Sequence, residues 1–275
     1  MIKRVKAPVR IDFAGGTTDI APFTHIGGAV LNAAINHYIK GELIATDKKV
    51  GLKYYADIPT NSGLGTSGAM NVVWLALITR IKNKIELAEK AYKLEQAIGF
   101  TGGKQDQYTA ALGGINFLEF KDEKVKITKL NLKKSTIKEL EDSLLLHYTG
   151  KPHFSTNINK AMINNFVKGK NVDSLLRIRN IAKEMKSTLK KNDLNKFAEL
   201  LNEEFKERKK LSSKVTNQKI NKLINFGLMH GAIAAKLCGA GGGGSILFYC
   251  KNKSKLMKEL DCIDFKFDFK GLQWY

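Results

Sequence analysis

Three glycine-rich segments, far apart in the chain, constrain its fold more than any other feature of the sequence. They are residues 13–19, residues 59–69 and residues 236–245. Glycine allows positive φ angles and a close approach of backbone to a ligand, but ordering it costs more conformational entropy than ordering any other residue. A single loop of this kind is weak evidence for a site. Three of them in 275 residues indicate that several turns approach one ligand.

The middle segment, residues 59–69, follows a predicted strand and opens a predicted helix. The first turn of a helix presents unpaired N–H groups and the positive end of the helix dipole, so phosphate is its natural ligand. Thr66 and Ser67 add hydroxyls for phosphate or Mg²⁺. The segment is not a Walker A loop, because no lysine follows Gly65 at the required place. The alternative is a tight strand-to-helix turn with hydroxyl capping.

The other two segments each allow a functional and a structural interpretation. In the first, a strand carrying Arg10 leads to two glycines and then to Thr17, Thr18 and Asp19, polar groups that suit the hydroxyls of a sugar or polyol. The alternative is a solvated turn in which Asp19 caps a helix. In the third segment five of the six residues 239–244 are glycine. Either backbone approaches a ligand there, or the loop is a flexible hinge.

The remaining pattern predicts an α+β protein in two lobes. Predicted strands are residues 5–13, 41–46, 50–56, 114–120, 143–148, 245–250 and 263–269. Helical spacing covers residues 64–81 and 85–98, and almost all of 155–229, with a lysine-rich helix before the last strand. Near residue 145 the pattern changes from alternating strands and helices to almost continuous helix. This change predicts an N-terminal domain of residues 1–145 and a C-terminal domain of residues 146–275.

The net charge of +20 attracts anions and raises the question of nucleic-acid binding. The lysines are dispersed along predicted helices and few aromatic residues interleave with them, so nucleic acid is an unlikely partner. Three widely spaced cysteines argue against a disulfide framework or a zinc site. No apolar run is long enough to cross a membrane, and the N-terminus lacks a signal-peptide pattern. These features predict a cytoplasmic protein.

The glycine segments, in this order, resemble the three motifs of the GHMP kinases, and the resemblance extends from Ala7 to Ser245. Residues 13–19, 103–108, 113–117 and 145–150 are most similar to the sugar-kinase branch that phosphorylates D-glycero-D-manno-heptose 7-phosphate. The motif around Asp106 is the most specific of these. The resemblance implies a left-handed β-α-β unit in the N-terminal domain and a helix-covered antiparallel sheet in the C-terminal domain. The active site would lie between the domains.

The resemblance also implies a reaction, the phosphorylation of a sugar or sugar-phosphate hydroxyl by ATP with Mg²⁺, and a role for each motif residue. Asp106 and Arg10 would be catalytic, and Ser67 and Glu95 would bind the metal. The implied nucleotide-binding residues are Pro59, Ser62, Gly63, Leu64, Gly65, Thr66, Ser67, Gly68 and Ala69. The implied substrate-binding residues are Gly15, Gly16, Thr17, Thr18, Asp19, Gly103, Gly241 and Gly242.

Two departures from the family, in residues 44–59 and in residues 151–155, affect the substrate more than the reaction type. Residues 151–155 replace a segment that tends to carry an arginine in the heptose kinases. The region between residues 44 and 59 is a single short hairpin where relatives often insert a longer segment near the adenine, which leaves the preference for ATP open. Lys104 and Lys151 are candidates for a phosphate already present on the substrate. The alternatives are a kinase for an isoprenoid precursor such as mevalonate, a catalytically silent nucleotide sensor, and a basic nucleic-acid-binding protein on a related scaffold.

Overall fold

The structure is a computed structural model that describes residues 1–150 and 155–275. Its elements, in chain order, are β1 (Ile2–Ala14), the 3₁₀ helix η1 (Phe23–Ile26), β2 (Gly28–Ala45), β3 (Val50–Ala56), α1 (Thr66–Ile78), α2 (Lys84–Ala97), α3 (Gln105–Leu112), β4 (Ile115–Lys121), β5 (Lys124–Lys129), α4 (Lys134–Ser143), β6 (Leu144–Tyr148), α5 (Ser155–Val167), α6 (Val172–Lys190), α7 (Leu194–Leu211), α8 (Gln218–Met229), β7 (Ala232–Leu237), β8 (Ser245–Cys250), α9 (Ser254–Glu259), β9 (Cys262–Ile263) and β10 (Gln273–Trp274). Among the described residues, no helix has both the length and the apolar character that a membrane crossing requires.

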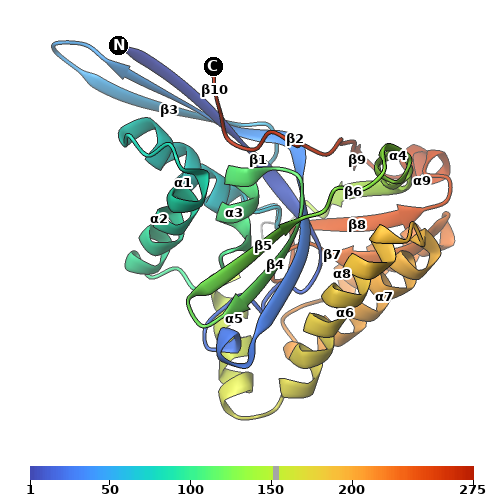
Figure 1. Ribbon diagram of the computed structural model, residues 1–275. Coiled ribbons are helices and arrows are strands. Elements are labelled where there is room, and N and C mark those ends of the chain that lie inside the picture. Colours follow the sequence, from blue (N-terminus) through green and yellow to red (C-terminus); the bar gives the residue numbers. More distant parts are fainter. Residues whose placement is uncertain (151–154) are drawn as a thin grey trace.

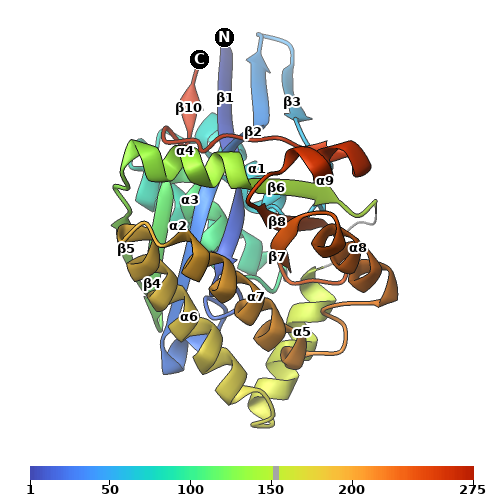
Figure 2. The same ribbon diagram turned by 90° about the vertical axis from the view of Figure 1, so that its right-hand side faces the viewer.

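The larger sheet is built on the long hairpin of β1 and β2. Its strand order is β10-β1-β2-β4-β5, and β3 pairs with the outer half of β2. Figure 2 shows both termini at the end of the molecule where the β2–β3 hairpin projects. Strands β3 and β4 both run antiparallel to β2, and are therefore parallel to each other. The predicted β-α-β unit corresponds to their connection through α1, α2 and α3, and its left-handedness stays a prediction.

The smaller sheet has the order β7-β8-β6-β9, and all its pairings are antiparallel. Helices α7 and α8 pack against β7, and α4 packs against β6. This arrangement is the predicted helix-covered antiparallel sheet. The third glycine segment is the turn between β7 and β8, so the β7–β8 hairpin delivers it to the centre of the molecule (Figure 1).

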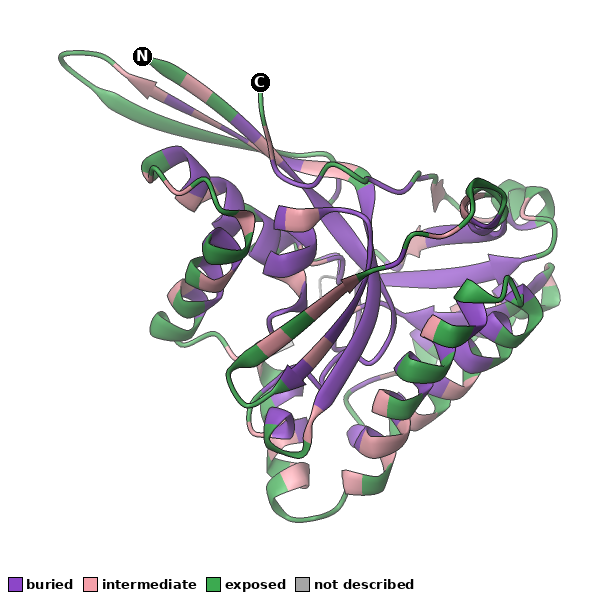
Figure 3. Cartoon of the chain, viewed as in Figure 1, coloured by how far each residue is buried: buried purple, intermediate pink, exposed green. Residues whose placement is uncertain are grey.

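One hydrophobic core joins the two halves of the chain. Helices α1 and α3 pack on the larger sheet, as does α6 from the other half of the chain. Phe13 of β1 contacts Phe197 of α7 edge to face, with ring centroids 5.3 Å apart. Figure 3 shows the central strands β2 and β4 and strand β8 buried along much of their length, with β3 exposed and β5 only partly covered. The predicted division at residue 145 falls inside β6, while β10 at the C-terminus pairs with β1.

Strands β5, β7 and β10 were not predicted, and the predicted strands differ from the structure in two places. Strand β2 begins at Gly28, whereas its predicted start was residue 41. Its first eight residues are all buried, so they lack the apolar–polar alternation that reveals a strand with one solvated face. The predicted strand 263–269 was wrong beyond Ile263. There the chain crosses between the sheets, and its backbone bonds to Ala34, Asn36 and Gly114.

Candidate functional site

The three glycine segments meet at one cavity of about 460 Å³. Gly16, Gly63, Gly65 and Gly239 all line it. The second and third segments touch backbone to backbone, because a Cβ at Gly63 would lie 2.6 Å from the Cys238 carbonyl oxygen. Side chains at these contacts would force the loops apart. The structure therefore brings together the turns that the sequence placed far from one another.

Asp106 and Arg10 form an ion pair at the wall of this cavity. Asp106 lies in the first turn of α3 and Arg10 on β1, and Arg10 Nε donates to Asp106 Oδ1 at 2.7 Å. Arg10 Nη1 also donates to the carbonyl of Gly63 at 2.7 Å. A Cβ on Gly68 would lie 2.6 Å from Asp106 Cβ, so the N-termini of α1 and α3 are in close contact. Asp106 thus faces the loop that precedes α1.

Glu95 and Ser67 lie beside this pair, on α2 and in the first turn of α1. The Glu95 carboxylate accepts from Ser67 Oγ at 3.1 Å, Asn71 Nδ2 at 2.7 Å and Gln107 Nε2 at 2.6 Å. Burial, and after it the charge of Asp106, raise the pKa of Glu95 to about 7. A nearby cation would favour the ionised form of this carboxylate.

A carboxylate and a hydroxyl beside a helix N-terminus fit Mg²⁺, which is usually held by one or two carboxylates and by substrate phosphates. Among residues 1–150 and 155–275 there is no group of three His, Cys, Asp or Glu side chains that would hold a metal alone. The donor set of Glu95 and Ser67 therefore suits an ion that arrives with a nucleotide, and it does not suit a permanently bound structural metal.

Asp19 also lines the cavity, and it lies against Gly103. Its Oδ2 accepts from the Gln105 backbone N–H at 3.0 Å, while Oδ1 has no hydrogen-bond partner among the described residues. A Cβ on Gly103 would lie 2.0 Å from Oδ2, so only glycine admits the carboxylate here. Burial raises the pKa of Asp19 to about 6, against the effect of the Gln105 N–H. Gly16 and Thr17 line the same cavity.

The other predicted site residues do not line the cavity. These are Gly15, Thr18, Pro59, Ser62, Leu64, Gly68, Ala69, Gly241 and Gly242. Thr18 donates to the Gly15 carbonyl at 2.7 Å and accepts from the Ala29 N–H at 3.1 Å, which fastens the first glycine turn to β2. A Cβ on Gly241 would meet the Val215 carbonyl at 2.4 Å. The structure thus gives Thr18 and Gly241 contacts that shape the backbone.

The two lysines proposed for a substrate phosphate are placed differently. Lys104 is buried, and its Nζ donates to Glu89 at 2.7 Å and to the Glu123 carbonyl at 3.0 Å, away from the cavity lining. Its charge is therefore already compensated by protein groups. Lys151 lies outside the described residues.

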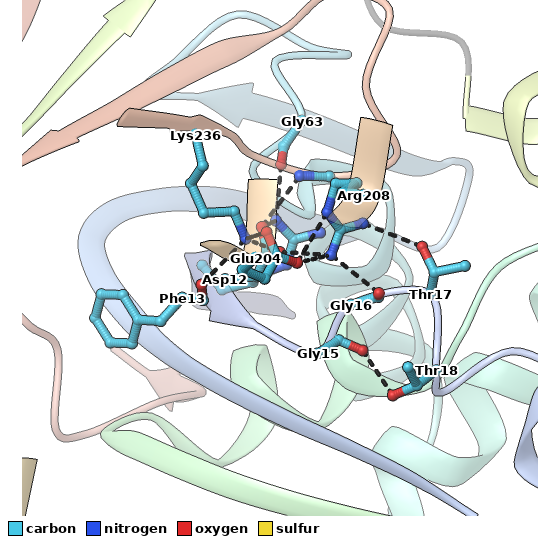
Figure 4. A network of polar contacts seen from close by, with 12 residues as sticks. Asp12, Phe13, Gly15, Gly16, Thr17, Thr18, Gly63, Glu204, Arg208 and Lys236 are labelled. Atoms are coloured by element: carbon cyan, nitrogen blue, oxygen red, sulfur yellow. Dashed lines mark hydrogen bonds and ion pairs between the residues drawn. The ribbon is translucent and has the colours of Figure 1, made fainter. Parts of the chain in front are cut away.

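Four buried charged residues beside the cavity were not predicted from the sequence, and Figure 4 shows them. They are Asp12 on β1, Glu204 and Arg208 on α7, and Lys236 on β7. A signal for them was present in the sequence. Glu204 and Arg208 continue the apolar stripe of α7 at helical spacing, and Asp12 shares a strand face with Arg10.

The hairpin between residues 44 and 59 also contributes to the cavity, although none of its residues was predicted to lie there. Tyr54 and Tyr55 of β3 line the cavity together with Ile39 of β2 and Met70 of α1. The short hairpin between residues 44 and 59 thus supplies apolar and aromatic surface next to the loop before α1. Phe100 and Asn159 are further lining residues that the sequence analysis did not single out.

The chain matches two parts of one protein family. Residues 29–114 match the GHMP kinases N terminal domain, and residues 185–266 match the GHMP kinases C terminal domain. It is 27% identical to a D-glycero-alpha-D-manno-heptose 7-phosphate kinase of Campylobacter jejuni, over 98% of both chains.

Two solved structures share the fold. The first is described as a sugar kinase from Campylobacter jejuni, with a TM-score of 0.78 and 26% identity over 100% of this chain and 98% of that one. The second is described as a D-glycero-D-manno-heptose 1-phosphate kinase from Bacteroides thetaiotaomicron, with a TM-score of 0.79 and 24% identity over 100% and 99% of the chains. At 24% identity, this second structure supports the fold of the chain and carries no argument about its activity.

Proposed function

Because the chain belongs to the GHMP kinase family, we propose that it transfers the γ-phosphoryl group of ATP to a hydroxyl of a sugar or sugar phosphate. The acceptor we propose resembles D-glycero-D-manno-heptose 7-phosphate, the substrate named for its relative in Campylobacter jejuni. One observation carries the proposal. Asp106, Ser67 at the N-terminus of α1 and the buried carboxylate of Asp19 all line the same cavity.

The start of α1 suits the nucleotide phosphates. Gly65, the residue before the helix, has φ 72° and no side chain to cap the first turn. The first N–H groups of α1 are therefore available to an anion, and the helix dipole favours negative charge there. Tyr54, Tyr55 and Met70, farther along the cavity wall, provide the flat apolar surface that an adenine base requires.

Glu95 and Ser67 are the residues that would hold Mg²⁺, as judged by their donor atoms and position. The ion would neutralise charge on the β- and γ-phosphates. Glu95 is prepared for this role by its surroundings, since the hydrogen bonds from Ser67, Asn71 and Gln107 orient both of its oxygens.

Asp106 would receive the hydrogen bond of the attacking hydroxyl and hold it in line with the γ-phosphate. An ionised aspartate is a weak base, so alignment contributes more than proton abstraction. Arg10 fixes the Asp106 carboxylate through its Nε at 2.7 Å. Its buried guanidinium also lies where negative charge develops during transfer, and a preorganised cation there stabilises the transition state.

The acceptor end favours a polyhydroxylated ligand over an isoprenoid acid. The buried Asp19 Oδ1 without a partner is an acceptor that a sugar hydroxyl would satisfy. Mevalonate offers fewer hydroxyls than a sugar, and its own carboxylate would be repelled by an ionised Asp19. This chemistry makes mevalonate the weaker alternative.

An acceptor panel tests the proposal. The protein would be incubated with ATP and Mg²⁺ and with heptose 7-phosphate, free heptose and hexoses, or mevalonate, and phosphorylated products would be identified by mass spectrometry. We expect product with a sugar or sugar phosphate. Consumption of mevalonate alone would contradict the sugar assignment. Salt-sensitive RNA binding without any transfer would contradict the kinase assignment itself.

A further inference from the structure

Four buried charged side chains form a cluster that the phosphoryl-transfer chemistry does not use. This buried ion cluster consists of Asp12, Glu204, Arg208 and Lys236, each at most 1% exposed (Figure 4). Lys236 Nζ lies 2.9 Å from Asp12 Oδ2 and 3.1 Å from Glu204 Oε2. Arg208 Nε donates to Glu204 Oε1 at 2.9 Å. The cluster joins β1, α7 and β7 across the two halves of the chain.

The cluster is electrically balanced, with two acids and two bases. Burial alone would raise the pKa of Asp12, but Lys236, Arg208 and Arg10 hold this pKa below its ordinary value. Such clusters seldom stabilise a fold more than apolar side chains of the same volume would, because desolvation offsets the attraction. Stability alone is therefore a poor explanation for four charges at the base of a ligand cavity.

Arg208 reaches from this cluster to the first glycine turn. Its Nη1 donates to Thr17 Oγ1 at 3.1 Å and its Nη2 donates to the Gly16 carbonyl at 3.0 Å. Arg208 also lines the cavity, as do Gly16 and Thr17. Glu204 accepts hydrogen bonds from both Nε and Nη2 of Arg208. The planar guanidinium is therefore fixed in an orientation that directs Nη1 and Nη2 toward the turn.

Thr17 is the residue of the turn that most needs such support. It has φ 80°, a backbone conformation that β-branched residues rarely adopt. A residue in this region is held there only when its surroundings determine its conformation, and functional sites are where this strain concentrates. The two hydrogen bonds from Arg208 act on Thr17 and on the residue before it.

We propose that Arg208, held by Glu204, is a positioning residue that keeps the acceptor loop, residues 15–19, in its strained conformation for sugar binding. The sugar-binding part of this inference rests on the proposed kinase function, whereas the positioning of the loop does not. Helix α7, from the C-terminal half of the chain, thereby contributes to an acceptor site that includes Gly16, Thr17 and Asp19 from the N-terminal half.

Hydrogen–deuterium exchange tests the positioning directly. The amides of Thr18 and Ile20 donate to the carbonyls of Gly15 and Thr17, so their exchange reports on the loop. Arg208→Lys keeps the charge but loses the fork of donors, and the double variant Glu204→Gln/Arg208→Gln removes one charge of each sign. We expect amide exchange in peptides covering residues 15–20 to become about tenfold faster or more, with peptides of α1 unchanged.

A control comes from a partly exposed ion pair that joins the surfaces of α6 and α7. Arg177 Nε donates to Glu203 Oε1 at 2.6 Å, away from the cavity. The variant Glu203→Gln/Arg177→Gln removes a comparable pair and should leave exchange in residues 15–20 as in the wild type. Equal exchange in the Arg208 variants and the wild type would overturn the positioning role, whether or not the protein proves to be a kinase.

Kinetics then test the link to the acceptor. In Arg208→Lys we expect the KM for the sugar acceptor to rise about 10- to 100-fold, while the KM for ATP stays within about threefold. Equal increases in both KM values would indicate general damage and overturn a specific role. Faster loop exchange in a protein that phosphorylates no sugar would support the positioning and reject the proposed function.

Discussion

Asp19 and Asp106 are carboxylates of the same cavity with different surroundings. Asp19 is 2% exposed and one of its oxygens has no partner among the described residues. The Asp106 side chain is 26% exposed and paired with Arg10 at 2.7 Å. Asp19 is thus prepared to accept a ligand hydroxyl, whereas Asp106 is held in place by the guanidinium of Arg10.

The pKa of Asp19 makes a prediction about stability. Burial raises this pKa from 3.8 to about 6, so the folded state binds a proton more tightly than the unfolded state. The free energy of unfolding of the ligand-free protein should therefore fall as pH rises from about 4 to about 6. The substitution Asp19→Asn should remove this pH-dependent loss of stability, because asparagine does not ionise.

Urea unfolding at pH 4.5 and pH 8 checks the prediction. Asp19→Asn should be more stable than the wild type at pH 8, by on the order of 2 kcal/mol, and the difference should shrink toward pH 4.5. Sugar affinity of the variant should fall. A stability difference that is the same at both pH values would show that ionisation of Asp19 is not its cause.

At the residue scale, the family resemblance singled out Arg10, Glu95 and Asp106 by their places relative to recognisable motifs, and all three line the cavity. The sequence did not locate Arg208, because its partners Gly16 and Thr17 lie about 190 residues away in the chain. No local pattern encodes a contact of that kind. An arginine on an apolar helix stripe shows only that some buried partner must exist.

Among the elements, the contact between α1 and α3 determines where Asp106 points. Gly68→Ala would place a Cβ 2.6 Å from Asp106 Cβ and 3.2 Å from the Gln107 backbone nitrogen. Alanine raises helix propensity by only about 0.5–1 kcal/mol, whereas overpacking costs about 1–3 kcal/mol. The clash should therefore dominate, lower the melting temperature and reduce kcat.

A control for Gly68→Ala lies in the loop between α2 and α3. Gly102→Ala adds the same methyl group where no atom lies within 4 Å, and Gly102 is not among the glycines with positive φ. Thermal unfolding of the two variants should separate a local clash from the general effect of replacing glycine. A Gly68→Ala protein as stable and active as Gly102→Ala would contradict the close packing of α1 and α3.

Element prediction succeeded where one pattern dominated. Strands β3 and β8 and the buried stripe of α7 were found because β-branched, aromatic or periodic apolar residues are dense there. The first half of β2 was missed because it is buried throughout and rich in alanine. The segment after Ile263 was misjudged because β-forming residues there bridge two sheets and do not extend one.

For the whole molecule, the shared core predicts cooperative unfolding. Met185 and Phe197 belong to the same core cluster as Phe13 and Phe117, and β10 pairs with β1. Differential scanning calorimetry should therefore show one transition, and a fragment of residues 1–145 should not fold alone. Two separate transitions would indicate that the predicted domains are independent, as is common in multidomain chains.

The central claim is that Asp106 lies between a nucleotide and a sugar in one cavity. The most direct test is transfer of radioactive γ-phosphate from ATP to heptose 7-phosphate by the wild type and by Asp106→Asn, with nucleotide affinity measured by calorimetry. We predict that the variant loses activity by about 100-fold or more and binds nucleotide within about threefold of the wild type. Transfer at the wild-type rate by pure Asp106→Asn would contradict the account.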